Sequence, residues 1–217
     1  IKDRKYDSIS KVDSSILEVS ILSNAFLDMS KSIYEYQQSV EQRTKELNIK
    51  NEELFKLSIT DKLTGLYNRV KLDSVLKENM SLSLRYGNIF SIIIIDIDFF
   101  KKINDNFGHQ VGDDVLKECS YILSQNIRNV DTLGRWGGEE FLVVCPETLK
   151  DGAKDLAIKL NKALEIYKFT TYPNSVTISV GVSSCEMKDM KYDDIISRAD
   201  KALYEAKRNG RNRVEVL

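Results

Sequence analysis

The chain has 217 residues, of which 42% are hydrophobic and 30% charged, as expected for one globular domain with an appendage. Its net charge of −1 argues against a nucleic-acid-binding surface, and three widely spaced cysteines without CxxC or zinc-ligand spacing indicate reduced thiols in a cytosolic protein. The apolar run at residues 92–95, with its close neighbours, is far too short to span a membrane, and no signal peptide is present.

The first part of the chain carries a seven-residue hydrophobic repeat. Residues 19–57 contain neither glycine nor proline, so nothing in this stretch interrupts a helix. One helix cannot bury such a long stripe alone, which favours a coiled coil with a second copy over a helix packed on its own domain. One seam holds Val19, Phe26, Ile33, Val40, Leu47 and Leu54, and the other holds Leu22, Met29, Tyr36, Arg43, Lys50 and Leu57.

Residues 18–29 resemble the second helix of a HAMP linker, a module that carries signals from a membrane sensor to an output domain. A first HAMP helix is not visible. The sequence starts at Ile1 rather than at Met, so we expect a fragment, the cytoplasmic part of a bacterial inner-membrane protein whose sensor lies upstream. We predict a helical stalk over residues 1–57 and a second domain over residues 58–217.

From residue 58 the pattern changes to alternating strands and helices. Thr60 or Asp61 is expected to cap a helix, and Gly65 to break the regular secondary structure. The remaining elements are expected in this order: a buried strand over 89–95, helices from 99 and over 111–128, a hairpin of 132–135 and 140–145 turned by Gly137 and Gly138, a helix over 150–168, a strand over 176–182, a helix over 192–208 and a strand over 213–216.

The first candidate site begins where the buried strand ends, at Asp96. An unpaired buried charge is costly, so packing alone does not explain this carboxylate. A carboxylate beside a turn suits a hard cation such as Mg²⁺, and the first amides of the next helix, at Phe99, Phe100 and Lys101, can face phosphate oxygens. The alternative, in which Asp96 and Asp98 only cap that helix, is equally compatible with these residues.

The second candidate site is the segment Gly-Gly-Glu-Glu-Phe at residues 137–141. Two glycines permit a tight turn, and two adjacent carboxylates there repel each other unless a cation lies nearby. An ordinary hairpin turn prefers Asn-Gly or Asp-Gly without an acidic pair. A solvated acidic turn is therefore the weaker interpretation.

Together these segments resemble the GGDEF family of diguanylate cyclases, which join two GTP molecules into cyclic di-GMP. The signature here is a common active variant of Gly-Gly-Asp-Glu-Phe, and the resemblance runs from about Ser58 to the C-terminus. It implies an α/β (α+β) fold with a mainly antiparallel five-stranded sheet wrapped by helices, like the palm of polymerases and adenylyl cyclases. The motifs that carry it are residues 61–69, 96–105, 108–113, 137–141 and 206–212.

The resemblance also assigns metal ligands and catalytic residues. Asp96, the backbone carbonyl of Ile97 and Glu139 would hold Mg²⁺ or Mn²⁺, with Glu140 supporting a second ion. Glu139 would act as the base for a ribose 3′-hydroxyl, and Lys101 joins it among the catalytic residues. In this reaction a 3′-oxygen attacks the α-phosphorus of a second GTP and pyrophosphate leaves.

The same resemblance places the β- and γ-phosphates of GTP at the amides of Phe99 and Phe100 and at the cations of Lys101, Lys207 and Arg211. An alternative remains open for two of these residues. Lys207 and Arg211 are four residues apart near a helix end, where cations commonly complement the helix dipole.

The guanine is expected to be read by Asn104 and Asp113, with His109 against the same nucleotide. Guanine offers two donors on one edge, for which a carboxylate is the natural acceptor. His109, the only histidine of the chain, has the alternative of being an ordinary loop residue.

Arg128 and Asp131 form an Arg-x-x-Asp motif shortly before Gly137, where family members with product inhibition carry their inhibitory site. By spacing alone, an ion pair closing a helix would explain them better. Their position within the family pattern favours the binding of cyclic di-GMP.

Because the product needs two GTP molecules and each domain holds one, two domains must face each other, and the stalk predicts such a homodimer. Three other functions are alternatives: a catalytically silent module that senses cyclic di-GMP, a cyclase for a hybrid dinucleotide, and a coiled-coil adaptor. The catalytic positions argue against the first, Asp113 against the second, and the carboxylates against the third.

Overall fold

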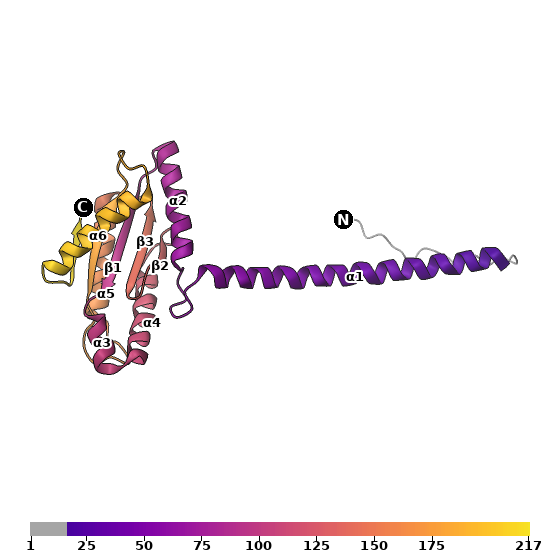
Figure 1. Cartoon of the computed structure of the whole chain (residues 1–217), viewed down its shortest axis with the longest axis horizontal. Coiled ribbons are helices and arrows are strands. Elements are labelled where there is room, and N and C mark those ends of the chain that lie inside the picture. Colours follow the sequence, from indigo (N-terminus) through magenta and orange to yellow (C-terminus); the bar gives the residue numbers. More distant parts are fainter. Residues whose placement is uncertain (1–16) are drawn as a thin grey trace. The chain divides into compact units, whose positions relative to one another are not determined.

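The structure, a computed structural model, describes residues 17–217, and the chain divides into two compact units between Phe55 and Lys56 (Figure 1). α1, Leu17–Ile59, is one helix of 43 residues, which confirms the long helix expected here. The apolar side chains of its repeat are exposed, from 39% at Val19 to 72% at Tyr36. The part of the predicted stalk on residues 1–16 lies outside the described residues. Within residues 17–217, every helix is too short or too polar to cross a membrane.

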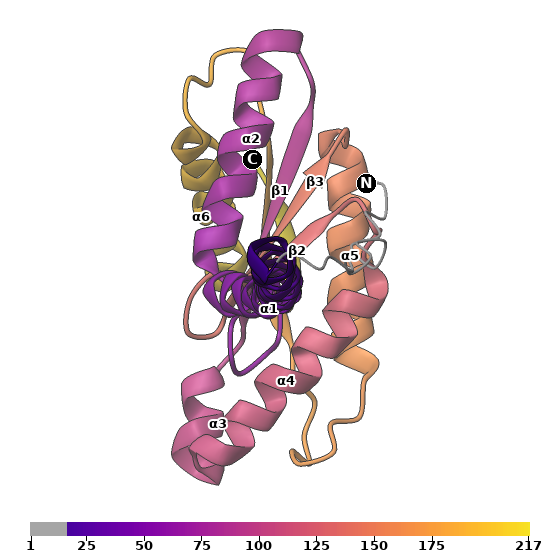
Figure 2. The same cartoon turned by 90° about the vertical axis from the view of Figure 1, so that its right-hand side faces the viewer.

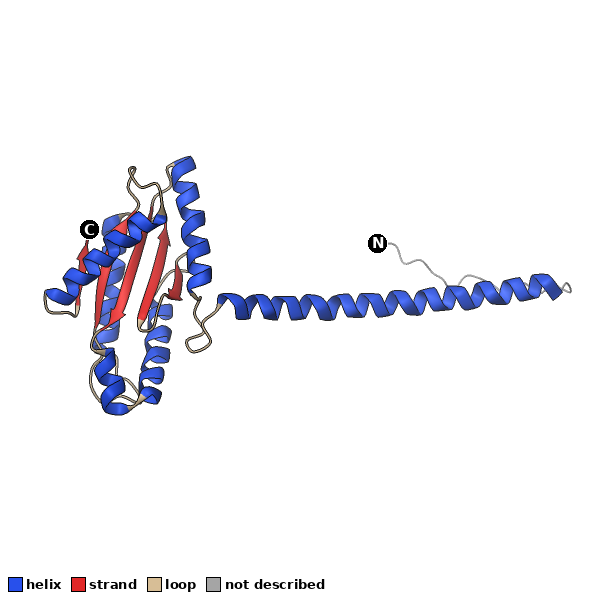
Figure 3. Cartoon of the chain, in the orientation of Figure 1, coloured by secondary structure: helices blue, strands red, loops and turns tan. Residues whose placement is uncertain are grey.

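A sheet forms the centre of the second unit, with helices packed around it (Figure 3). Its strands are β1 (Phe90–Ile97), β2 (Thr132–Arg135), β3 (Glu140–Pro146), β4 (Ile178–Ser184) and β5 (Arg213–Val216). The strand order is β2-β3-β1-β4-β5, and every neighbouring pair is antiparallel except β4 and β5. The mainly antiparallel five-stranded fold is therefore confirmed.

Helices cover both faces of this sheet (Figure 2). One face packs against α2 (Arg69–Tyr86) and α6 (Tyr192–Arg208). The other packs against α3 (Phe100–Phe107), α4 (His109–Asn126) and α5 (Lys150–Ile166). β1 lies between the two layers and is buried along its whole length, which explains why four consecutive isoleucines, residues 92–95, form its centre.

Alternation along β1 decides which layer each side chain enters. Ile93 and Ile95 belong to the core under α4 and α5, whereas Ile92 and Ile94 belong to the core under α2 and α6. Because side chains alternate strictly along a strand, Asp96 lies on the face of α2 and α6. At one point on this face the sheet and α6 nearly touch: a Cβ on Gly181 would overlap the backbone of α6.

Two local predictions were wrong. Neither Thr60 nor Asp61 caps a helix, because α2 begins only at Arg69, where the side chain of Asn68 accepts a hydrogen bond from the backbone N–H of Lys71 at 3.1 Å. The helix expected over 111–128 covers His109–Asn126 instead, so Arg128 lies beyond its end.

Candidate active site

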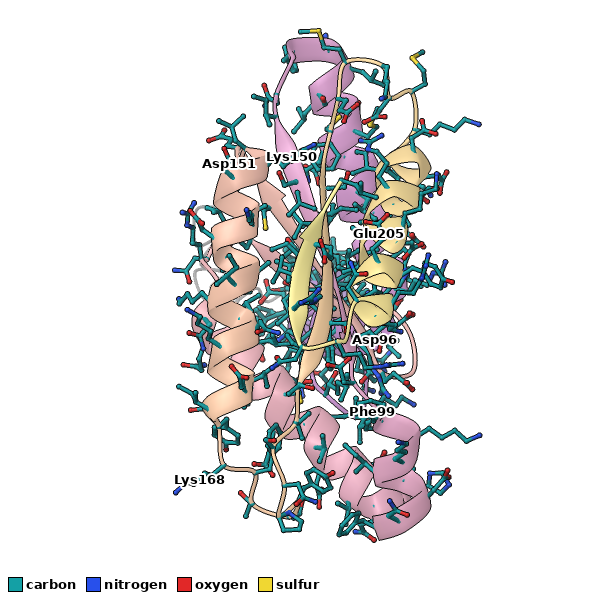
Figure 4. The ribbon with its side chains drawn as sticks, turned by 90° about the vertical axis from the view of Figure 1, so that its left-hand side faces the viewer. Asp96, Phe99, Lys150, Asp151, Lys168 and Glu205 are labelled. Carbon is teal, nitrogen blue, oxygen red and sulfur yellow. The ribbon has the colours of Figure 1, made fainter. Side chains whose placement is uncertain are left out.

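The sheet register brings the two acidic motifs together at one end of the molecule. Asp96, near the end of β1, pairs directly with Glu140, the first residue of β3. The N–H of Ile97 donates to the carbonyl oxygen of Glu139 at 3.4 Å, so Glu139 follows immediately beside this pair. Figure 4 shows Asp96 and Phe99 at this end of the sheet, far from the first turn of α5 at Lys150.

A lysine from the opposite layer meets this acidic group. Lys207, in the last turn of α6, places its Nζ 2.7 Å from Oδ2 of Asp96. Burial raises the pKa of the Asp96 carboxyl, and the hydrogen bond and charge of Lys207 offset part of that shift. Lys207 therefore does more than complement a helix end.

The surroundings of Glu139 and Glu140 disfavour the negatively charged forms of both side chains. The pKa of Glu139 and that of Glu140 are raised, in both cases first by burial and then by the nearby charge of Asp96. Lys207 lowers both in part. Both side chains are half-buried, so this hairpin end is not a simple solvated acidic turn.

The donor chemistry fits a hard divalent cation, because carboxylate oxygens in a site with excess negative charge are the ligands that Mg²⁺ prefers. In the arrangement over residues 17–217, no group of three or more acidic, histidine or cysteine side chains surrounds one point closely enough to hold a metal ion. The ammonium group of Lys207 lies against Asp96 instead.

The hairpin turn is held by Arg135, a residue to which the sequence assigned no role. Arg135 donates from Nε and Nη2 to the carbonyl oxygen of Gly138 at 3.0 and 2.6 Å, and from Nη1 to Oδ1 of Asp61 at 3.2 Å. Burial acts to raise the pKa of Asp61, but hydrogen bonds from Thr64 and the charge of Arg135 outweigh it and lower the pKa. Gly137 leaves room for Glu140, since a Cβ there would lie 2.9 Å from its Oε2.

The turn between β1 and α3 has an unusual backbone. Phe99 is the N-cap residue of α3, with a left-handed φ of 56° and no side-chain capping bond. Neither Asp96 nor Asp98 caps this helix, so that alternative is wrong. Asp98 is buried and accepts hydrogen bonds from the hydroxyls of Thr177 and Ser179 at 2.8 and 2.6 Å.

Two cations surround the ring of Phe99. The guanidinium of Arg211 lies 4.5 Å from the ring centroid and the ammonium of Lys102 lies 4.6 Å from it. Phe100 is buried in the core, whereas Lys101 is exposed in the first turn of α3. α6 ends at Arg208, so Arg211 lies beyond the helix, over the turn.

The residues expected to read guanine lie where α3 and α4 meet. A Cβ on Gly112 would overlap Oδ1 of Asn104, which places that amide against the start of α4, one residue before Asp113. Asp113 and His109 are exposed. His109 is the first residue of α4, so it is not a loop residue.

Arg128 and Asp131 form a turn rather than an ion pair. The backbone N–H of Arg128 donates to Oδ2 of Asp131 at 3.0 Å, and the N–H of Asp131 donates to the carbonyl of Arg128 at 3.1 Å. Oδ1 of Asp131 is buried without a hydrogen-bond partner, while Arg128 is exposed. The alternative interpretation, an ion pair between these two side chains that closes a helix, is therefore wrong.

Comparison with known proteins shows the family of the chain. The family model described as "Diguanylate cyclase, GGDEF domain" matches residues 58–213. The chain belongs to this family. The response regulator PleD of Caulobacter vibrioides is 40% identical to the GGDEF chain over 162 residues, which cover 73% of this chain and 36% of that protein. Diguanylate cyclase A of Treponema denticola is 40% identical over 198 residues, covering 88% and 52%.

Solved structures share the fold of the GGDEF chain. The coiled coil and GGDEF domain of DgcB from Caulobacter crescentus, solved in complex with c-di-GMP, has a TM-score of 0.80 and 25% identity, covering 86% of this chain and all of that one. The active GGEEF domain of a diguanylate cyclase from Vibrio cholerae has a TM-score of 0.66 and 38% identity, covering 69% and 96%. The chain spans about half, or less, of the length of the curated relatives above.

Proposed function

We propose that this GGDEF chain is a diguanylate cyclase that condenses two GTP molecules into cyclic di-GMP and two pyrophosphates. The observation that carries the proposal is the convergence of Asp96, Glu139 and Glu140 beside Lys207, at the edge where the left-handed turn at Phe99 begins α3. An acidic group next to a phosphate-facing helix start suits nucleotidyl transfer.

Asp96, Glu139 and the carbonyl of Ile97 would hold Mg²⁺ or Mn²⁺, with Glu140 in support, and the bound metal would supply charge neutralisation at the phosphates. Lys207, whose ammonium group lies against Asp96, would contribute a positive charge to phosphate binding at this site. Glu139 accepts the proton of the 3′-hydroxyl, a task that its raised pKa suits because a base works best with a pKa near the operating pH.

The remaining site residues orient the nucleotide. The amides of Phe99 and Phe100, with Lys101, Lys207 and Arg211, bind the β- and γ-phosphates in this proposal. The guanine edge lies between α3 and α4 in this proposal, where the carboxylate of Asp113 accepts from its N–H donors, the amide of Asn104 forms a further hydrogen bond, and His109 lies alongside. Holding two reactants in register supplies much of the rate enhancement in such a reaction.

Two domains must meet for each product molecule, and we assign that role to residues 1–57 as a dimerising stalk, with residues 58–217 as the cyclase. A long apolar stripe that is exposed in the single chain supports this assignment. An upstream membrane sensor, signalling through the HAMP-like segment from the inner membrane, completes the proposed arrangement. This chain would then be its cytoplasmic part.

Product inhibition is proposed at Arg128 and Asp131. Arg128 is exposed and free of an ion pair with Asp131, and one oxygen of Asp131 has no hydrogen-bond partner. An arginine can grip a phosphate or a guanine edge with two parallel bonds, and a carboxylate can accept from the same guanine. DgcB of Caulobacter crescentus was solved with c-di-GMP.

The second candidate, a silent module that senses cyclic di-GMP, is kept because the features at Arg128 and Asp131 alone would support it. One experiment separates the two. The protein is incubated with GTP and Mg²⁺ and the product is identified by mass: the cyclase gives cyclic di-GMP, and Glu139→Ala gives none while remaining folded by circular dichroism. Binding of cyclic di-GMP without turnover would establish the silent module instead. In a second incubation that contains both GTP and ATP, a mixed dinucleotide as the main product would change the assigned substrate.

A further inference from the structure

The turn that follows α6 has a strained backbone at two consecutive residues. Arg211 and Asn212 have φ values of 64° and 44°, in the left-handed region that residues other than glycine seldom occupy. The turn starts at Gly210, whose φ of 113° only glycine tolerates readily. Such strain persists only where surrounding contacts hold it.

Asn212 is held on three sides. Its backbone N–H donates to Oδ2 of Asp98 at 3.0 Å, and its Oδ1 accepts from Nδ2 of Asn161 at 3.2 Å. Its own Nδ2 donates to Oε1 of Glu165 at 2.7 Å. One residue of the turn is thereby joined to the end of β1 and to two positions on α5.

The anchors of this clamp are themselves fixed. Asp98 is 5% exposed and accepts from Thr177 and Ser179, so its carboxylate cannot move far. Asn161 is 8% exposed and also donates to the carbonyl of Ile178 at 2.9 Å. Two of the three anchors, Asp98 and Asn161, are therefore buried and fixed, whereas Glu165 is exposed.

The rigidity of this turn restricts Arg211, the residue that precedes Asn212. Arg211 places its guanidinium over the ring of Phe99, the N-cap residue of α3, in the turn proposed above to bind the phosphates. With the backbone of 211 and 212 fixed in the left-handed region, the arginine has little freedom to leave that turn. A side chain ordered in advance loses less conformational entropy when its ligand binds.

We propose that Asn212, clamped by Asp98, Asn161 and Glu165, is a positioning residue that presets Arg211 for the β- and γ-phosphates of GTP. The inference rests on the proposed cyclase function and deepens it. Asn212 does not contact the nucleotide in this proposal, and it acts only through Arg211.

The test compares Asn212→Ala and Asn212→Gly with the parent protein. We expect the KM for GTP to rise about three- to tenfold in both variants, with kcat changed less than twofold, because ordering one long side chain on binding costs about that factor in affinity. Glycine accepts the left-handed backbone and keeps the backbone N–H bond to Asp98, but it lacks both side-chain bonds of the clamp, so a parent-like KM in Asn212→Gly would overturn the proposal. Asn209→Ala is the matched control, since Asn209 makes one exposed side-chain bond, to Glu215, in the same turn.

Two further measurements separate positioning from a general loss of structure. Affinity for a non-reactive GTP analogue should fall by the same factor, whereas affinity for GMP, which lacks the β- and γ-phosphates, should not change. In an Arg211→Ala background, Asn212→Ala should have no additional effect on KM. An equal loss of GMP affinity, or full additivity with Arg211→Ala, would contradict the proposal.

If Asn212→Ala does not fold, Glu165→Ala removes one clamp bond from an exposed side chain and should raise the KM about twofold. An unchanged KM in folded Glu165→Ala would then count against the clamp. The binding arms do not need turnover: a parent that binds the GTP analogue but forms no cyclic di-GMP would refute the cyclase function and still test the role of Asn212.

Discussion

At the scale of single residues, the site gathers charges that do not favour folding by themselves. The pKa values of Asp96, Glu139 and Glu140 are all raised by burial, and those of the two glutamates also by Asp96. A carboxyl group with a raised pKa in the folded protein binds its proton more tightly there than in the unfolded chain. Its ionisation therefore lowers the free energy of unfolding, and such perturbed pKa values are common at functional sites.

This argument predicts the effect of Glu139→Gln on stability. Protonated Glu139 stabilises the folded protein, and this stabilisation is lost as the pH rises from the usual pKa of glutamate through the raised pKa. The loss of unfolding free energy is therefore largest at alkaline pH. Without divalent metal, Glu139→Gln should unfold about 1–2 °C above the parent at pH 8, a small shift because the side chain is only half-buried. The difference should vanish near pH 4. Glu147→Gln, at an exposed glutamate beyond β3, is the control.

Arg128→Ala tests the inhibitory site. The variant should start at nearly the rate of the parent, because Arg128 lies outside the acidic site and forms no ion pair with Asp131. Progress curves with micromolar cyclic di-GMP should show slowing of the parent and none of the variant, as expected for coupling between separate sites. Equal slowing of both proteins, or none of either, would remove Arg128 from product binding.

At the scale of elements, the acidic hairpin between β2 and β3 is positioned by the fork of Arg135. One guanidinium joins the carbonyl of Gly138 to the carboxylate of Asp61, in the segment that connects α1 with α2. A lysine has one ammonium group on a flexible stem and cannot make both contacts in this planar geometry. The position of Glu139 should therefore depend on Arg135.

Arg135→Lys should reduce kcat about ten- to a hundredfold, the cost of a small misplacement of catalytic groups, and change the KM for GTP much less. Arg213→Lys is the matched control, because Arg213 is exposed and makes only a loose pair with Glu215 at 3.6 Å. Steady-state rates at saturating GTP check the prediction. A kcat equal to that of the control would show that the fork supports stability alone.

At the scale of the whole molecule, the described part of the stalk, residues 17–57, presents an exposed apolar stripe. Association with a second stalk would bury that stripe and bring two cyclase domains within reach of each other. The effective concentration of the second domain would then be set by the stalk rather than by the solution.

A chain that starts at Ser58 should therefore be largely monomeric. Its rate per molecule should rise with protein concentration, whereas the rate of the chain with its stalk should not. Sedimentation and initial rates over a nanomolar to micromolar series measure both properties. Full activity of the shortened chain at nanomolar concentration would show that the domains meet without the stalk.

The sequence by itself determined the elements whose signal is local. The isoleucine run and its acidic end located β1 and Asp96, the glycine pair located the hairpin, and periodicity located α6 with the bounds 192–208 that the structure has. The family motifs then predicted the five-stranded fold and brought Glu139 to Asp96 before any register was known. Each of these signals depends on neighbours in the chain.

Only the tertiary structure decided which hydrogen-bond partner each of these polar residues has. Asp61 and Asn68 are both suitable helix caps, and Asn68 caps α2 while Asp61 pairs with Arg135, 74 positions further along the chain. Asp98 likewise suits a cap by sequence, yet its carboxylate binds Ser179 and the backbone of Asn212, 81 and 114 positions away. A short polar side chain has several possible hydrogen-bond partners, and the folded sheet selects among them because a buried carboxylate must be satisfied wherever the fold places it.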